Sequence, residues 1–172
     1  MNNKCLQCPH EGRDNVFCRT CSVVLENIVP LPVKMSTTMQ KEYIQEFYVR
    51  YTDWFPVDFS ADVKLWIACQ SALETGYGKS AIYLENNNLF GMKMPKLRPT
   101  YAVSINRGHA CYKHHMDSLL DYLALLFFNR ITKKDYASIE NFERFITKIG
   151  YCPSVTYTKT INKILHNYGG KN

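Results

Sequence analysis

The sequence lacks the features of a membrane-spanning or unfolded chain. Its longest uninterrupted apolar run, from Tyr122 to Phe128, is much shorter than the ~20 residues that a bilayer-spanning helix requires. The first eight residues contain no continuous apolar stretch, so we expect no secretory signal. Hydrophobic residues make up 46% of the chain and charged residues 21%. This balance is typical of folded domains and excludes a disordered or collagen-like protein.

Acidic residues are missing from one long segment. Residues 86–116 contain no Asp or Glu, and the whole chain has a net charge of +6. The basic side chains of this segment are Lys93, Lys96, Arg98, Arg107 and Lys113. Such an excess attracts polyanions in general, whether nucleic acid, acidic wall polymer or anionic lipid, and does not choose between them. A solvated basic face is an equally simple interpretation.

The cysteines fall into two groups. Two CxxC pairs, separated by nine residues, lie near the N-terminus: Cys5, Cys8, Cys18 and Cys21. Two such pairs suit the tetrahedral coordination of Zn²⁺, so we expect a structural zinc site. The alternative is two disulfides, which would require an oxidising compartment. The other three cysteines are isolated in the sequence and are predicted to be small buried residues.

A change in composition near residue 35 predicts two parts. The segment from Asn27 to Val33 has two prolines and no charge, which is typical of an extended connector. We therefore expect a small zinc-binding module with its linker over residues 1–35 and a main domain over residues 36–172.

Helical periodicity dominates the main domain. Apolar spacing and capping residues predict helices over residues 39–51, 61–74, 79–85, 117–130, 138–149 and 155–168. Residues 99–115 are rich in β-branched and aromatic residues around Asn106-Arg107-Gly108, which predicts a hairpin. The expected fold class is α+β, mostly helical with one small sheet.

Glu74 is the one carboxylate whose predicted position is unfavourable for an anion. It ends the apolar helix 61–74, where burial and the partial negative charge of the helix C-terminus both raise a carboxyl pKa. Glycoside hydrolysis needs a protonated carboxylic acid near neutrality, because the leaving oxygen must receive a proton. A solvated glutamate at a helix end is the alternative interpretation.

Two segments around Glu74 carry recognisable motifs, ACQSALETGYGKS (residues 68–80) and NNLFGMK (residues 87–93). They resemble the bacterial glucosaminidases of glycoside hydrolase family 73, which include flagellar and autolysin-type peptidoglycan hydrolases. Weaker likeness continues over residues 110–113, 118–122 and 150–157. The resemblance covers about residues 38–168 and implies a lysozyme-like fold.

The resemblance also implies roles for individual residues. Glu74 matches the general acid of the family, and Tyr157 matches a tyrosine that lines the cleft near the scissile bond and assists catalysis. A substrate-binding role is implied for Asn88, Phe90, Gly91 and Tyr151. In this interpretation the Asn88 amide binds an acetamido group and the Phe90 ring stacks on a sugar, although a core position for Phe90 fits equally well.

The chain departs from the family in its acid-free hairpin, where many members carry a second carboxylate. Glu85 and Asp117 flank this segment but have no motif support. We therefore expect substrate assistance, in which the 2-acetamido group attacks its own anomeric carbon while Glu74 protonates the leaving group. Pro153-Ser154 also departs from the family, which tends to have an acidic residue there. Three nearby histidines lack the spacing of a metal site, so no cofactor is expected for catalysis.

The sequence thus predicts an endo-β-N-acetylglucosaminidase that binds and cleaves the peptidoglycan glycan strand. A non-catalytic peptidoglycan-binding protein and a muramidase are the alternatives with the same fold, and a nucleic-acid-binding protein is a weaker one. Because the substrate lies outside the cytoplasm and no signal is apparent, we expect a bacteriophage protein. It would be either a virion-associated lysin with other phage structural proteins as partners or an endolysin released through a holin. No membrane partner is expected.

Overall fold

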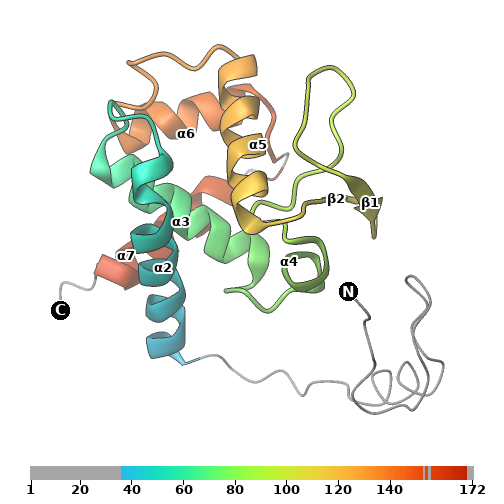
Figure 1. The fold of residues 1–172 in the computed structure, drawn as a ribbon. Coiled ribbons are helices and arrows are strands. Elements are labelled where there is room, and N and C mark those ends of the chain that lie inside the picture. The colour runs from blue at the N-terminus through green and yellow to red at the C-terminus, as the bar shows by residue number, and fades with distance from the viewer. Residues whose placement is uncertain (1–35, 153, 155, 170–172) are drawn as a thin grey trace. The chain divides into compact units, whose positions relative to one another are not determined.

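The computed structural model describes residues 36–152, 154 and 156–169, and it is an α+β fold, mostly helical with one small sheet (Figure 1). No helix in these ranges is long and apolar enough to cross a bilayer. The elements, in chain order, are α2 (Thr37–Tyr51), the 3₁₀ helix η1 (Thr52–Trp54), α3 (Ala61–Thr75), α4 (Ala81–Asn86), β1 (Ser104–Asn106), β2 (His109–Cys111), α5 (His115–Phe128), α6 (Ile139–Lys148) and α7 (Tyr157–Gly169). The six predicted helices and the hairpin are confirmed.

Polar side chains decide where most of these helices begin. Serine hydroxyls accept a hydrogen bond from the backbone N–H three residues later at the starts of α2, α3, α4 and α6 (Ser36, Ser60, Ser80 and Ser138). Since Ser80 caps α4, that helix begins at Ala81 and not at residue 79 as predicted. Helix α5 begins two residues earlier than predicted, because Asp117 accepts a hydrogen bond from the His114 N–H, 3.0 Å away.

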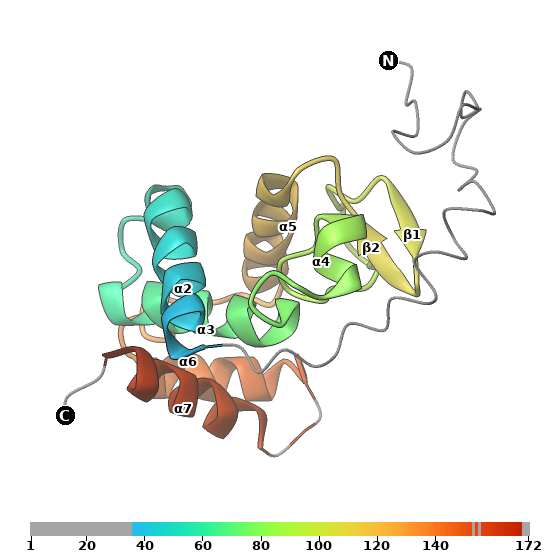
Figure 2. The same ribbon diagram turned by 90° about the horizontal axis from the view of Figure 1, so that it is seen from below.

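Helix α3 is the central element of the core. It contacts α2, α6 and α7, and both views show it among these helices (Figures 1 and 2). The buried Trp66 indole N–H donates to Asn162 of α7 over 2.9 Å. Gly76, in the left-handed conformation, ends α3 by donating its N–H to the last turn. Most residues of α3 from Trp66 onward are buried, and Glu74 lies in its last turn.

The hairpin has three-residue strands. β1 and β2 pair antiparallel, with Ser104 opposite Cys111 and Asn106 opposite His109. Arg107 and Gly108 form the turn with positive φ angles of 53° and 74°, as a two-residue type I′ connection requires. β2 contacts α4, and the hairpin lies beside α4 in both views (Figures 1 and 2).

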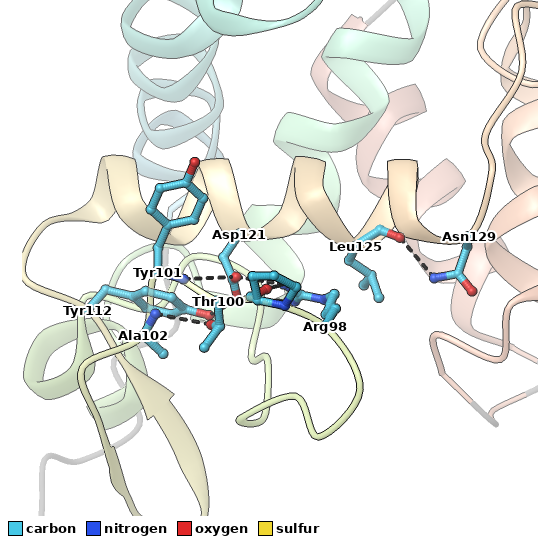
Figure 3. A network of polar contacts seen from close by, with 9 residues as sticks. Arg98, Thr100, Tyr101, Ala102, Tyr112, Asp121, Leu125 and Asn129 are labelled. Carbon is cyan, nitrogen blue, oxygen red and sulfur yellow. Dashed lines mark hydrogen bonds and ion pairs between the residues drawn. The ribbon is translucent and has the colours of Figure 1, made fainter.

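A buried ion pair anchors the long connection between residue 92 and β1. Asp121 of α5 is 0% exposed and accepts two hydrogen bonds from the Arg98 guanidinium, over 2.7 and 3.1 Å. The Tyr112 hydroxyl and the Tyr101 N–H also donate to it (Figure 3). Burial alone would raise the pKa of Asp121, but these hydrogen bonds, one from Thr100 and the charge of Arg98 hold it below its ordinary value.

Candidate active site

The candidate site is built around the Glu74 carboxyl group. This side chain is half-buried in the last turn of α3. Burial raises the pKa of Glu74 above its ordinary value, and the hydrogen bond from Tyr157 and the nearby His109 only partly oppose this effect. The direction is the one predicted from the sequence, and it favours a protonated acid at a higher pH than a free glutamate allows.

Tyr157 contacts Glu74 directly although the two residues are 83 positions apart. It is the first residue of α7, and its hydroxyl donates to Glu74 Oε1 over 2.5 Å. Burial and the adjacent Glu74 carboxyl raise the pKa of Tyr157 far above its ordinary value. The hydroxyl is therefore a neutral donor.

Gly91 borders the other oxygen of the same carboxyl group. A Cβ atom built at this position would lie 2.9 Å from Glu74 Oε2, which is closer than a carbon can approach without displacement. The backbone here also has a φ of +60°, a region that glycine adopts without steric cost. Gly91 therefore leaves the space beside Oε2 free of side-chain atoms.

Asn88 is buried beneath the loop of residues 87–92 and holds it in place by hydrogen bonds. The side chain is 1% exposed. Its NH₂ group donates to the Met92 and Ala110 carbonyls, both at 2.9 Å, and its Oδ1 accepts from the Phe90 and Met92 N–H groups. The amide thus holds the loop against β2 and does not present itself to a sugar. The expectation that it binds an acetamido group is corrected accordingly.

Phe90 is a core residue. It is 1% exposed, its ring stacks on Tyr122 with centroids 4.0 Å apart, and it meets the edge of Phe47. A ring covered in this way has no face for a sugar, so the stacking interpretation is wrong and the core interpretation is confirmed. Its carbonyl accepts a hydrogen bond from the Tyr151 hydroxyl over 2.6 Å.

Tyr151 links the loop of residues 87–92 to Tyr157. Its ring lies 5.9 Å from that of Tyr157, at an interplanar angle of 30°. Together with the bond to the Phe90 carbonyl, this contact fixes the start of α7 against residues 87–92. A substrate contact of Tyr151 stays a prediction.

Two residues of the site were not predicted from the sequence. Gln70 and Tyr122 are both 0% exposed. The Tyr122 hydroxyl donates to Gln70 Oε1 over 2.7 Å, and Gln70 Nε2 donates to the Tyr157 oxygen over 3.0 Å. Gln70 and Ser71 are the two polar residues between Leu65 and Leu73 of α3. Gln70 lies four positions before Glu74, on the same helix face. That spacing is the signal that could have identified it.

The two carboxylates that flank the acid-free segment have other partners. Glu85 is exposed and forms an ion pair with Arg107, with contacts of 2.8 and 3.0 Å. The hydrogen bond from Arg107 lowers the pKa of Glu85. Asp117 caps α5 through the His114 N–H. The first residue of β2, His109, is near enough to Glu74 to affect its pKa.

Metal ligands do not gather in the part of the chain that the structure describes, where no three His, Cys, Asp or Glu side chains form a potential site. Cys69 is buried, as predicted, whereas Cys111 and Cys152 are half-buried, and all three are free thiols. Cys5, Cys8, Cys18 and Cys21 lie outside the described residues, so the zinc site stays a prediction.

Glu74 is a half-buried acid with a raised pKa, and the neutral Tyr157 hydroxyl contacts it. An acid of this kind in an α+β fold is typical of a glycoside hydrolase site. The family model described as mannosyl-glycoprotein endo-beta-N-acetylglucosaminidase matches residues 62–170. The chain belongs to this glucosaminidase family and is a glycoside hydrolase, as the resemblance predicted.

The other comparisons add a likeness of fold. The catalytic domain of the autolysin Auto from Listeria monocytogenes is 17% identical, with a TM-score of 0.55, over 90% of this chain and 96% of that one. At this identity the likeness shows the fold alone. A comparison with curated proteins finds no match.

Proposed function

We propose that this enzyme is a peptidoglycan hydrolase that cleaves the glycan strand at N-acetylglucosamine, with Glu74 as its general acid. The observation that carries the proposal is the Glu74–Tyr157 pair, in which a 2.5 Å hydrogen bond fixes a carboxyl group whose pKa is raised by burial. Membership of the glucosaminidase family supports an N-acetylglucosaminide as substrate. The likeness to an autolysin catalytic domain supports the bacterial wall as its source.

The chemistry that we propose uses a single carboxyl group. Glu74 donates its proton to the glycosidic oxygen as the bond from that oxygen to the anomeric carbon breaks. The acetamido oxygen of the same sugar attacks the anomeric carbon and forms a cyclic oxazolinium intermediate. A water molecule then opens this ring, and the Glu74 carboxylate takes the proton that the water releases. The acid-free segment 86–116 and the other partners of Glu85 and Asp117 support this route.

Mass spectrometry of the products tests the proposal. Purified sacculi are digested with the protein, and the released muropeptides are examined for the sugar at their reducing end. We expect N-acetylglucosamine there, and the Glu74→Gln variant should release almost none. Reducing-end N-acetylmuramic acid would overturn the proposed bond and favour a muramidase. Binding to sacculi without any release would favour a non-catalytic binding protein.

Two finer proposals from the sequence accompany this one. The first is that the enzyme is a phage lysin, carried by the virion or released through a holin. The second is that the CxxC pairs bind a structural zinc ion, for which four thiolates at this spacing are suitable ligands.

A further inference from the structure

A series of hydrogen bonds leads through the core to the acid. The Tyr122 hydroxyl donates to Gln70 Oε1 (2.7 Å), Gln70 Nε2 donates to the Tyr157 oxygen (3.0 Å), and the Tyr157 hydroxyl donates to Glu74 Oε1 (2.5 Å). We refer to Tyr122, Gln70, Tyr157 and Glu74 as the hydrogen-bond relay. Because Gln70 and Tyr122 are 0% exposed, their polar atoms depend on these partners.

The chemistry of the groups fixes the direction of the relay. An amide oxygen only accepts hydrogen bonds, an amide NH₂ group only donates, and a tyrosine hydroxyl has one hydrogen to give. Since the Gln70 NH₂ group faces the Tyr157 oxygen, the Tyr157 hydrogen is free to point at Glu74. With the Gln70 amide reversed, its carbonyl oxygen would compete with Glu74 for that hydrogen. Because the ionised Glu74 carboxylate can only accept, it takes the Tyr157 hydrogen, and the Gln70 amide must then donate to Tyr157 and accept from the Tyr122 hydroxyl.

The two oxygens of Glu74 therefore have different surroundings. Oε1 accepts the hydrogen bond from Tyr157, so it is the oxygen less suited to carry the acidic proton. Oε2 lies beside Gly91, where a Cβ atom would come within 2.9 Å. A side chain at residue 91 would crowd Oε2, and glycine avoids that contact.

We propose that Gln70 and Tyr122 are positioning residues, which hold the Tyr157 hydroxyl on Oε1 of Glu74 and so reserve Oε2 for the proton that is transferred. This inference rests on the proposed role of Glu74 as general acid. Neither residue needs to touch the substrate, since both act through Tyr157. When Glu74 has given up its proton, the aligned donors also stabilise the carboxylate that remains.

The test is a titration of the Glu74 carboxyl carbon by NMR, in the full chain labelled with ¹³C at glutamate carboxyls. The Glu74 signal is assigned as the one missing from the Glu74→Gln variant. We expect Gln70→Met to raise the titration midpoint by about 0.5 pH units, a part of one hydrogen bond to a charged group, because Gln70 acts on Glu74 through Tyr157. Tyr122→Phe should raise it less, by about 0.3 pH units, because it acts through two intervening residues.

Tyr112→Phe is the matched control. It removes one buried tyrosine hydroxyl that donates to Asp121 outside the relay, so it should lose stability and leave the Glu74 midpoint unchanged. Midpoints that do not rise in Gln70→Met or Tyr122→Phe, or that rise equally in Tyr112→Phe, would overturn the proposal. If Gln70→Met does not fold, Tyr122→Phe decides. Since the titration requires no activity, an inactive wild type would refute the proposed function and leave this test intact.

Discussion

At the scale of single residues, Glu74 shows which of two opposing effects is larger. Burial raises its pKa, the Tyr157 hydroxyl and His109 lower it, and the net pKa is raised. A carboxyl group whose pKa is higher in the folded than in the unfolded state makes folding less favourable as pH rises. The same shift keeps the Glu74 carboxyl group protonated up to a higher pH than a free glutamate. Activity should therefore decline as pH rises through this raised pKa, and Glu74→Gln should be no less stable than the wild type at neutral pH.

Gly91→Ala should abolish most activity while costing little stability. The added methyl group would lie 2.9 Å from Glu74 Oε2, and moving an acid by a fraction of an ångström reduces a rate by about tenfold or more. The matched control is Gly108→Ala, which has a φ of +74° and no atom within 4 Å. Both variants should lose about 1 kcal/mol in urea unfolding, from alanine in a left-handed conformation. Equal rates of wall lysis in the two variants would show that the close approach to Oε2 is unimportant.

The sequence singled out Glu74 and Tyr157, which the structure brings into contact, but it misjudged the burial of their neighbours. Glu74 and Tyr157 could be found because a helix end and a motif each indicate a single residue. Asn88 and Phe90 belong to the same motif, but a motif does not show whether a side chain points inward. Their burial depends on Tyr122 and Ala110, which lie more than twenty residues further along the chain.

At the scale of elements, the sequence predicted the helix starts and the turn that depend on residues close by in the chain. The serine caps and the Asn106-Arg107-Gly108 turn act within three or four residues, so the starts of α2, α3 and α6 and the position of the hairpin were predicted closely. The connection that precedes β1 was not, because the residues that hold it, Arg98 and Asp121, are 23 positions apart. Such pairs become apparent only in the folded molecule.

Asp121→Asn should test how far this ion pair holds the connection to α5. The variant leaves the Arg98 guanidinium buried without a counter-ion, which costs about 3 kcal/mol or more. Urea unfolding at pH 7 measures the loss. Because the pKa of Asp121 is lowered in the folded state, the contribution of the pair is present above the ordinary aspartate pKa and disappears as pH falls through the lowered one.

The control for this variant is Glu140→Gln, which breaks the exposed pair of Glu140 and Arg144. An exposed pair of this kind contributes about 0.5 kcal/mol or less. If Asp121→Asn were as mild as Glu140→Gln, the buried pair would not anchor the connection.

At the scale of the whole molecule, the site exists only when distant segments meet. Glu74 comes from α3, Gly91 from the loop after α4, His109 from β2 and Tyr157 from α7. The core packing of Phe90 on Tyr122 and Phe47 and the bond from Tyr151 to the Phe90 carbonyl hold the loop and α7 in place. The geometry of the candidate site therefore depends on the complete fold of the glucosaminidase domain.

The most direct test of the central claim is dye release from labelled sacculi by the wild type, Glu74→Gln and Glu85→Gln. Loss of a general acid reduces a rate by about 10² to 10⁴, so Glu74→Gln should release dye at least ~100-fold more slowly. Glu85→Gln, the same change at an exposed carboxylate, should stay near the wild-type rate if a single carboxyl group suffices. Undiminished release by folded Glu74→Gln would contradict the account.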